Sequence, residues 1–243
     1  MNWLDGKVIA NRHWTGSLFS LRIEAPPLAF EAGQFVRIAL PAGGELVARP
    51  FSFVNPPQDP VLEFYGVVVP EGPLSPGLAR LQTGERLQVA SNPAGFLVLS
   101  ELPDAETLWL LSTGTGIAPF LSILRTAVPW QRFKKVVLVH AVRRAEELVY
   151  QELILEFKKQ KAFRHVSFVS REPHASSLAG RIPAAIVDGR LEDAAGAQFS
   201  AQSQVMLCGN PAMLKDAQAA LVARGLRKHR RRSPGQITVE SFW

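Results

Sequence analysis

The rhythm of hydrophobic residues changes once along the chain, near residue 107, and this change constrains the fold more than any other feature. Before it, short runs of mostly alternating apolar and polar residues are separated by turns rich in glycine and proline. After it, continuous apolar runs such as Leu108–Ser112 alternate with longer segments of helical periodicity. Alternation indicates strands buried on one face, whereas continuous apolar runs between helices indicate parallel strands buried on both faces. The chain therefore predicts two domains of different construction.

The first domain, residues 1–101, is predicted to be a small antiparallel β-barrel. Runs of strand character occur at Lys7–Arg12, Leu18–Ala25, Gln34–Leu40, Phe51–Val54, Leu62–Val69 and Arg86–Ala90. Turns separate these runs and no long helical period interrupts them, as is typical of small barrels. One helical turn is expected at Ser75–Leu81, with Ser75 as its cap.

The second domain, residues 102–243, is predicted to be a doubly wound α/β fold with a five-stranded parallel sheet. The expected strands are Leu108–Ser112, Val136–His140, Val166–Ser170, Val205–Cys208 and Gln236–Val239. The expected helices are Pro119–Val128, Glu147–Lys161 and Pro211–Arg224. Such sheets bind ligands beyond the carboxyl ends of their strands, so the residues that follow each strand are candidates for a ligand site.

Composition excludes several classes of protein. With 243 residues, 47% of them hydrophobic, the chain can form a substantial core. No apolar run is long enough to span a bilayer and the N-terminus lacks the pattern of a signal peptide, so we expect no membrane association. The single cysteine excludes an internal disulfide and a cysteine-ligated iron–sulfur cluster in this chain, and it favours the cytoplasm. No metal site is predicted.

The net charge of +6 is unevenly distributed, with one dense run at Arg227–Arg232, here named the basic tract. Such a run is usually a solvated surface, but it also suits nucleic acid or an acidic protein partner. No aromatic residues are interleaved with it, and no zinc-finger or RNA-motif spacing accompanies it. The sequence therefore disfavours nucleic acid as a partner.

The stretch Ala48–Phe53 combines a cation, an aromatic ring and a small hydroxyl. Alternation along a strand places Arg49 and Phe51 on one side and Ser52 on the other. Pro50 has no N–H to donate, which predicts an edge strand that is free on one side. A guanidinium fork suits a phosphate, an aromatic face suits a flat ring, and a hydroxyl suits a ring nitrogen. The alternative is a surface charge beside an ordinary core aromatic.

Glycine-rich turns follow the first and fourth expected strands of the second domain. After the first strand comes Gly114-Thr115-Gly116-Ile117-Ala118-Pro119, which permits a tight turn and close approach of backbone to a pyrophosphate. It is neither a phosphate-binding Walker loop nor a full dinucleotide fingerprint. After the fourth strand comes Cys208-Gly209-Asn210-Pro211, in which Asn210 is expected to cap the helix that Pro211 opens.

Arginines follow the second and third strands, where an NAD-binding domain usually has an acidic residue for the ribose. The residues concerned are Arg143, Arg144, Ser170, Arg171 and Arg181. Guanidinium groups and a hydroxyl suit a 2′-phosphate and therefore favour NADP. The alternative is that each arginine lies on an ordinary exposed loop.

Three further segments are candidates for ligand contact. Tyr65–Val68 is a strand in which Gly66 permits close approach, and Glu71–Gly77 leads into the short helical turn; ordinary packing and an ordinary turn are the alternatives. The last run delivers Glu240-Ser241-Phe242-Trp243 beyond a core strand, and two aromatic residues there suit a flat ligand. A frayed tail is the alternative.

In this order and spacing, these motifs resemble the ferredoxin–NADP reductase family, specifically the bacterial flavodoxin/ferredoxin–NADP reductases. Arg49-Pro50-Phe51-Ser52 is similar to that family's flavin motif, and Gly33-Gln34-Phe35 to its barrel signature. Gly114–Pro119 is similar to its pyridine-nucleotide loop, and Cys208–Pro211 to its nicotinamide-side motif. The resemblance covers nearly the whole chain and implies FAD and NADP(H) as cofactors.

The resemblance also implies roles for individual residues. Those implied to contact FAD are Arg49, Pro50, Phe51, Ser52, Tyr65, Gly66, Val67, Val68, Leu74, Ser75, Thr115, Phe242 and Trp243. Those implied to contact NADP are Gly114, Gly116, Arg143, Arg144, Ser170, Arg171, Arg181, Cys208, Gly209 and Asn210. Those implied in catalysis are Ser52, Cys208 and Glu240. Phe51 and Phe242 stand where the family often has tyrosine, which keeps ring stacking but removes a hydroxyl.

The function that the resemblance implies is hydride exchange between NADPH and flavin, followed by single-electron exchange with ferredoxin or flavodoxin. A monomer acting on acidic carriers, without nucleic acid or membrane, is expected. Within the same class of enzyme, the alternatives are a flavin reductase and the reductase component of an oxygenase. A different class of alternative is a non-catalytic, redox-sensing binding module that has kept the fold.

Overall fold

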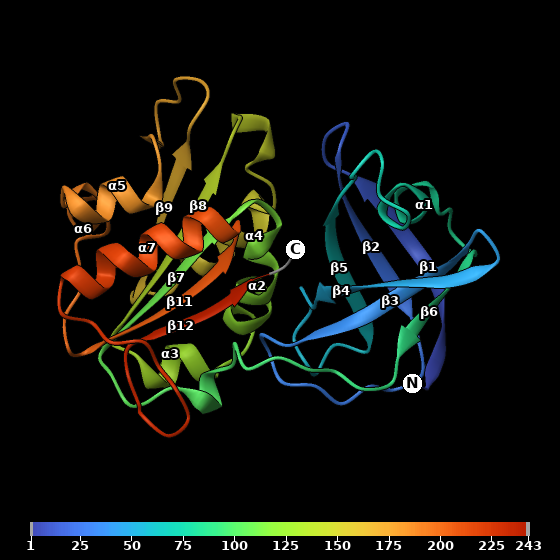
Figure 1. Cartoon of the computed structure of the whole chain (residues 1–243), viewed down its shortest axis with the longest axis horizontal. Helices are drawn as coiled ribbons and strands as arrows, with labels where there is room; N and C mark the ends of the chain where they lie inside the picture. The colour runs from blue at the N-terminus through green and yellow to red at the C-terminus, as the bar shows by residue number, and fades with distance from the viewer. Residues whose placement is uncertain (1, 242–243) are drawn as a thin grey trace. The chain divides into compact units, whose positions relative to one another are not determined.

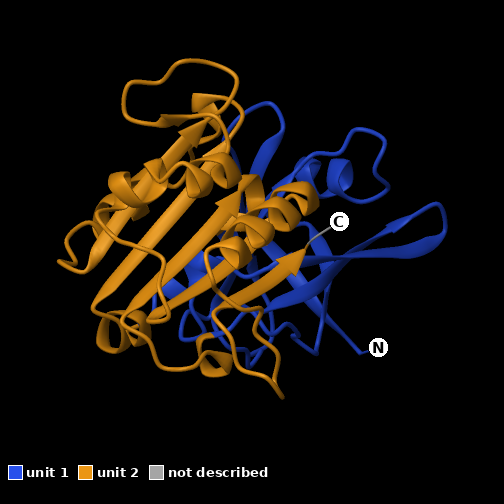
Figure 2. Ribbon diagram, turned by 60° about the vertical axis from the view of Figure 1, so that its left-hand side comes forward, with its two compact units in different colours: residues 1–98, 118–126 blue, residues 99–117, 127–243 orange. Residues whose placement is uncertain are grey.

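The computed structural model describes residues 2–241 and divides into two compact units (Figure 2). Unit 1 comprises residues 1–98 and 118–126, and unit 2 comprises residues 99–117 and 127–243. The chain thus leaves unit 1 after residue 98 and returns to it for one helix, α2 (Ala118–Leu124).

Unit 1 is built on a six-stranded antiparallel sheet with the order β4-β3-β6-β1-β2-β5. Its strands are β1 (Trp3–His13), β2 (Leu18–Glu24), β3 (Phe35–Ala42), β4 (Glu45–Ser52), β5 (Val61–Val67) and β6 (Arg86–Ala90). The sheet curls, because a bridge from Phe53, just after edge strand β4, reaches Phe64 on the opposite edge strand β5. The predicted antiparallel barrel is confirmed in this form, a curled sheet whose two edges meet through a bridge.

Two local predictions in unit 1 are corrected. The strand expected at Phe51–Val54 begins earlier, because Gly43 and Gly44 form a two-residue turn at positive φ that pairs β4 with β3 along its whole length. The short helix α1 (Ser75–Arg80) does not use Ser75 as its cap. Ser75 is its first helical residue, and its hydroxyl instead accepts a hydrogen bond from the Val69 amide at 2.9 Å.

Helix α2 is held in unit 1 by polar contacts as well as by its apolar residues. Ser122 donates a hydrogen bond to the Asn55 carbonyl at 2.7 Å. Arg125, just beyond the helix, forms ion pairs with Glu63 at 3.2 Å and Asp59 at 3.4 Å. These contacts anchor the helix that directly follows the glycine-rich turn at 114–117.

Unit 2 is built on a parallel sheet with the order β10-β9-β8-β7-β11-β12 (Figure 1). Its strands are β7 (Thr107–Thr113), β8 (Lys135–Val142), β9 (Phe163–Val169), β10 (Leu178–Ala179), β11 (Ser203–Gly209) and β12 (Ile237–Ser241). The five expected strands are present, and the predicted doubly wound fold is confirmed. The expected count of five is corrected to six, because the two-residue β10 is too short to show a hydrophobic period.

The helices of unit 2 are shorter and more numerous than expected. They are α3 (Val128–Arg132), α4 (Gln151–Phe157), α5 (Ile182–Val187), α6 (Arg190–Ala195) and α7 (Pro211–Ala223), with 3₁₀ turns η1 (Leu99–Glu101), η2 (Gly114–Ile117) and η3 (Ala145–Glu147). The helix expected from Glu147 starts only at Gln151, because Tyr150 adopts a left-handed conformation with φ of 58°. The helix expected to run to Val128 ends at Leu124, and Pro129 opens a separate helix.

The core of unit 2 lies between one face of the sheet and the helices that cover it. Alternate residues of the strands, such as Trp109, Val137 and Phe168, pack against α5, α6 and α7 on one face. Figure 1 shows α7 crossing this face of the sheet. Within residues 2–241, no helix is long and apolar enough to cross a membrane.

Candidate functional site

The strand order of unit 2 defines where its ligand site belongs. Strands β8 and β9 lie on one side of β7, and strands β11 and β12 lie on the other. The direction of winding therefore reverses between β7 and β11, and in doubly wound sheets the ligand crevice lies beyond the carboxyl ends of the strands at this point. The two glycine-rich turns singled out in the sequence follow these two strands.

The two turns lie against each other so closely that side chains would not fit between them. A Cβ atom on Gly116 would lie 2.5 Å from the Cys208 carbonyl oxygen. Gly209 has a φ of +135°, and a Cβ atom there would lie 2.2 Å from Thr113 Oγ1. Thr113 Oγ1 in turn accepts a hydrogen bond from the Asn210 amide at 2.8 Å. The glycines are therefore required by the close approach of the two turns.

Asn210 caps helix α7, as predicted. Its side-chain oxygen accepts hydrogen bonds from the amides of Ala212 at 2.9 Å and Met213 at 3.3 Å, and Pro211 occupies the first turn. The helix begins at the carboxyl end of β11, so its positive end faces the same side of the sheet as the glycine turns. A phosphate group is the ligand that such a terminus favours.

A row of polar side chains crosses the sheet in register, one from each of the five long strands. Glu240, Cys208, Ser112, His140 and Ser167 are successive register partners on β12, β11, β7, β8 and β9. Partners in register point to the same face of a parallel sheet. Residues next to them in β7, β8 and β11 belong to the core on the other face, namely Leu111, Val139, Ala141 and Leu207. The row therefore lies on the face opposite α7, near the carboxyl ends of the strands.

Burial keeps the acidic members of this row protonated. It raises the pKa of the Glu240 carboxyl to about 8. It also raises the pKa of the Cys208 thiol well above its usual range, and the neighbouring Glu240 raises it further. Glu240 Oε1 is buried without a hydrogen-bond partner among residues 2–241. At neutral pH, Glu240 is therefore a protonated acid that can donate a hydrogen bond or a proton.

The sequence analysis missed Ser112 and His140 as members of this buried row. Both are fully buried, and His140 donates a hydrogen bond from Nε2 to the Gly114 carbonyl oxygen at 3.0 Å. The available signal was a polar residue at the end of each of two apolar runs, at Ser112 and His140. Only the register of the strands shows that these two residues lie side by side, and the sequence alone does not give that register.

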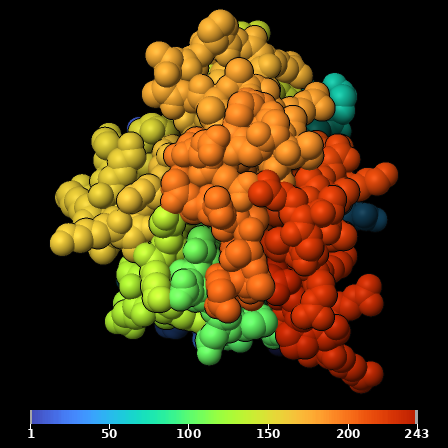
Figure 3. Space-filling model, turned by 90° about the vertical axis from the view of Figure 1, so that its left-hand side faces the viewer, coloured from blue at the N-terminus to red at the C-terminus, as the bar shows by residue number. Residues whose placement is uncertain are grey.

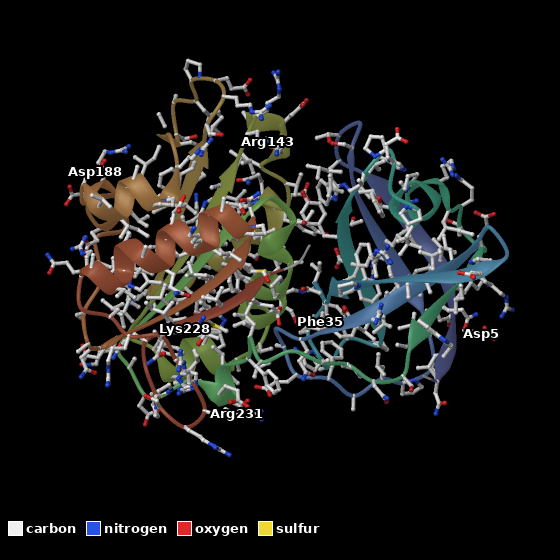
Figure 4. The ribbon with its side chains drawn as sticks, viewed as in Figure 1. Asp5, Phe35, Arg143, Asp188, Lys228 and Arg231 are labelled. Carbon is white, nitrogen blue, oxygen red and sulfur yellow. The ribbon has the colours of Figure 1, made fainter. Side chains whose placement is uncertain are left out.

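The predicted arginines gather at the carboxyl ends of β8, β9 and β10. Arg143, Arg171 and Arg181 are exposed, and in the described part of the chain none of their guanidinium groups forms an ion pair. Figure 4 shows Arg143 just beyond β8. The Arg171 amide donates to the Arg143 carbonyl at 2.9 Å, so these two loops are joined. Ser170 Oγ donates to the Val142 carbonyl at 3.2 Å. Arg144 differs from the others, because it pairs with Glu172 at 3.6 Å.

In unit 1, the predicted flavin motif lies on edge strand β4, as Pro50 indicated. Arg49 is exposed and its guanidinium contacts only the neighbouring Ala48 carbonyl among the hydrogen bonds within residues 2–241. Phe51 is half-buried and meets Phe64 edge-on, with ring centroids 6.4 Å apart. Ser52 is buried, and its Oγ has no hydrogen-bond partner in the described chain. The cation and the ring thus remain accessible beside an unsatisfied hydroxyl.

Strand β5 supplies the neighbouring part of this surface. A Cβ atom on Gly66 would lie 3.0 Å from the Phe51 ring and 2.9 Å from the Phe19 ring. Gly66 is therefore needed for Phe51 to lie against β5, which brings together two motifs that are remote in the sequence. Tyr65 is buried, whereas Val67 and Val68 are half-buried.

The remaining predicted residues are divided between the units. Leu74 is buried and Ser75 half-buried at the start of α1 in unit 1, and Thr115 is half-buried in η2 of unit 2. Gly33, from the barrel signature, has a φ of +105°, and a Cβ atom there would lie 2.0 Å from the Leu97 carbonyl oxygen. Phe242 and Trp243 lie outside the described residues.

Comparison with known proteins gives one consistent result. Residues 110–219 match the oxidoreductase NAD-binding domain family. The chain is 50% identical over 246 aligned residues to the flavodoxin/ferredoxin–NADP reductase of Escherichia coli (strain K12), covering 100% of this chain and 99% of the relative. It is 35% identical to the ferredoxin–NADP reductase of Pseudomonas aeruginosa, covering 98% and 97%. A crystal structure of a ferredoxin NADP⁺ reductase from Neisseria gonorrhoeae with bound FAD and NADP has a TM-score of 0.95 at 34% identity, covering 100% of both chains.

Proposed function

The chain belongs to the flavodoxin/ferredoxin–NADP reductase family, and we propose that it exchanges hydride with NADP(H) through FAD and single electrons with ferredoxin or flavodoxin. The observation that carries the proposal is the pairing of two separate surfaces in one chain. One has an accessible arginine and ring beside an unsatisfied hydroxyl, and the other has glycine turns, a helix start and free arginines. The first suits a flavin nucleotide and the second suits a pyridine nucleotide.

The residues of unit 1 fit FAD. We propose that Arg49 binds a pyrophosphate oxygen, Phe51 stacks on the ring system, and Ser52 Oγ hydrogen-bonds to a ring nitrogen. The buried Ser52 Oγ supports this, because a buried hydroxyl without a partner carries a free-energy cost that a ligand would remove. Tyr65–Val68, Leu74 and Ser75 are proposed to line the cofactor, and Pro50 to keep the strand edge open. When bound, FAD supplies the chemistry that links two-electron and one-electron donors.

The residues of unit 2 fit NADP(H). The glycine turns and the start of α7 offer backbone N–H groups to the pyrophosphate, and Arg143, Arg171 and Arg181 offer free guanidinium groups to the 2′-phosphate. Hydrogen bonds to charged groups are each worth about 1.5–3 kcal/mol. Two such arginines therefore support a preference for NADPH over NADH of roughly 10²- to 10⁴-fold. Arg144 contributes less in this proposal, because Glu172 already pairs with it.

Glu240 and Cys208 are proposed to act beside the nicotinamide. A protonated Glu240 can donate a hydrogen bond to a carboxamide oxygen, or move a proton, without placing a negative charge near the donor of hydride. Cys208, kept as a neutral thiol, presents a small polarizable group at the carboxyl end of β11. Both residues therefore favour a neutral environment at this end of the sheet.

The basic tract is proposed to steer acidic carriers rather than to hold them at the reacting groups. It lies in the loop between α7 and β12, where Arg231 pairs with Glu101 at 2.7 Å and Arg230 and Ser233 exchange backbone hydrogen bonds. Because this loop precedes β12, it lies at the amino end of the sheet, opposite the glycine turns (Figure 4). In Figure 3 the C-terminal part of the chain, in red, protrudes at the edge of the face shown. A charge there acts on approach through its long-range field.

We propose a monomer that acts in the cytoplasm, in keeping with its single, buried cysteine. The test of the proposed function is steady-state reduction of purified ferredoxin and flavodoxin by NADPH, with NADH as the matched donor. The expected result is NADPH-dependent reduction of at least one carrier. Reduction of free flavins without reduction of either carrier would indicate a flavin reductase instead, and no turnover with any acceptor would indicate a binding module.

A further inference from the structure

His140 is a buried histidine whose contacts point to the nucleotide turn rather than to the core. It occupies β8 between its register partners Ser112 on β7 and Ser167 on β9. It is 0% exposed, and the sole hydrogen bond of its ring within the described chain joins Nε2 to the Gly114 carbonyl oxygen at 3.0 Å. Gly114 opens the glycine turn with a φ of +53°. A side chain from the sheet thus holds the first peptide group of the turn.

The chemistry of this contact fixes the protonation state of the ring. A carbonyl oxygen can only accept, so Nε2 must carry the hydrogen and Nδ1 must be bare. Nδ1 is buried and has no partner among the described residues, which leaves no site to stabilise a second proton. Burial accordingly lowers the pKa of His140 to about 4. His140 is therefore a fixed, neutral hydrogen-bond donor at physiological pH.

The contact also sets the direction of the next amide. In a planar trans peptide, the C=O of one residue and the N–H of the next point in opposite directions. Because the Gly114 carbonyl is drawn toward His140, the Thr115 N–H is directed away from it. The remaining members of the turn are held from another side, since Gly116 abuts the backbone of Cys208 and Gly209. The orientation of the 114–115 peptide therefore depends on His140.

We propose that His140 is a positioning residue for NADP(H), which holds the Gly114 carbonyl so that the Thr115 N–H is presented to the nucleotide pyrophosphate. This inference rests on the proposed function of the glycine turn. His140 itself does not touch the nucleotide in this proposal. Its effect is transmitted through one peptide group, so it changes nucleotide affinity more than the rate of the reaction.

Two neighbours provide matched controls for the loss of a buried polar side chain. Ser112, the register partner of His140, is also fully buried, and it donates to the Val139 carbonyl at 2.8 Å without contacting the turn. His165, on β9, is a second histidine whose pKa is lowered, to about 3, by burial, and it has no hydrogen bond to the turn. Ser112→Ala and His165→Leu therefore perturb the same sheet while leaving the turn contact intact.

The experiment uses the FAD-loaded protein and compares His140→Leu, His140→Gln, Ser112→Ala and His165→Leu. The dissociation constant of NADP⁺ is measured from the difference absorbance of the flavin, and KM and kcat for NADPH are measured with ferricyanide as acceptor. We expect His140→Leu to raise both the dissociation constant and KM about tenfold, as for the loss of one net hydrogen bond, with kcat changed by less than about twofold. His140→Gln, which keeps an N–H donor, should recover most of the affinity.

The outcomes separate this inference from the proposed function. NADP⁺ affinity in His140→Leu that matches the wild type, or that falls no further than in the two controls, would overturn the role of His140 alone. A wild-type protein that binds no NADP⁺ would overturn both. If His140→Leu does not retain its fold, the inference is tested on the wild-type protein by NMR spectroscopy. The ¹⁵N resonance of His140 Nε2 should then shift when NADP⁺ is added while that of His165 stays fixed, and an unmoved His140 resonance would refute the inference.

Discussion

The two units assemble their candidate ligand groups in different ways. In unit 1, Arg49, Phe51 and Ser52 lie within four residues of one edge strand. The adjoining surface on β5 requires a single glycine, Gly66. In unit 2, the groups come from the ends of separate strands and are brought together by the winding of the sheet. The first site is local, so each substitution there should remove one contact. The second site depends on contacts between strand ends, so a substitution at one strand end should also displace the ligand-binding groups at the neighbouring strand ends.

The largest expected effect tests the arginines of unit 2. Arg171→Ala combined with Arg181→Ala should lower the preference for NADPH over NADH by roughly 10²- to 10⁴-fold, because two charged hydrogen-bond donors to the 2′-phosphate are lost. The measurement is the ratio of kcat/KM for the two coenzymes. Arg144→Ala serves as the control, since that side chain is already paired with Glu172. A double variant that keeps the full preference would show that the 2′-phosphate is bound elsewhere.

The next effect tests whether the two turns of unit 2 depend on each other. Gly209→Ala should destabilise the protein by about 3 kcal/mol or more, because its Cβ atom would overlap Thr113 and force the crossing turns apart. Gly225→Ala is the control. Gly225 also has a positive φ, of +88°, but has open space around it, so about 1 kcal/mol is expected. The free energy of unfolding in urea measures both. Equal costs would argue that the turns are independent.

A smaller effect comes from the buried carboxyl of Glu240. Its pKa is about 8 in the folded protein and near the model-compound value of 4.5 when unfolded, so the folded state holds a proton that the unfolded state releases. Stability should therefore fall as pH rises toward 8, by at most about 1.4 kcal/mol per pH unit. The two buried histidines are half-protonated at pH 6.5 when unfolded and contribute a slope of the opposite sign there, so the carboxyl is isolated by the difference between the wild type and Glu240→Gln. The stability difference between these two proteins should change with pH between 6.5 and 8, and a difference that stays constant over this range would contradict the assignment.

The opposite dependence is expected in acid. The pKa values of His140 and His165 lie near 4 and 3 in the folded protein, well below the value of 6.5 expected for the unfolded chain. Between these values the unfolded chain binds protons that the folded chain does not bind. Stability should fall as pH drops from about 6.5 to 4, by up to about 1.4 kcal/mol per pH unit for each histidine. Urea unfolding of the wild type and of His165→Leu measures this slope. A variant with an unchanged slope would show that His165 does not titrate on unfolding in this range.

The smallest effect concerns the basic tract. Reversing two exposed charges, as in Arg227→Glu with Lys228→Glu, should slow association with an acidic carrier about two- to threefold at low salt, and the difference should vanish at high salt. Stopped-flow association rates over a range of ionic strength provide the measurement. A decrease of more than about tenfold in the association rate that persists at high salt would mean that carriers dock directly on this loop.

The difference between the units also explains what the sequence could reveal. Features set by neighbouring residues were predictable: the edge position of Pro50, strand Arg86–Ala90, and the Asn210 cap followed by Pro211. Features set by contacts between distant residues were not. Strand β4 extends back to Glu45 because it pairs with β3 along its whole length, and β10 exists because β9 offers it an edge.

The candidate site divides in the same way. The glycine turns and arginines could be identified one by one, because each follows an expected strand. The polar row from Glu240 to Ser167 could not, because it depends on the register of five strands. His140 was predicted as the end of a strand, and its bond to Gly114 became visible only when β7 and β8 were placed side by side.

The central claim is that one chain carries both a flavin surface and a surface for NADPH. Its most direct test is the absorbance spectrum of the purified protein during anaerobic titration with NADPH. The account predicts a yellow protein with one FAD per chain, whose visible band bleaches with about one equivalent of NADPH but only with a large excess of NADH. A colourless protein that does not take up added FAD, or a yellow one that NADPH leaves unbleached, would contradict it.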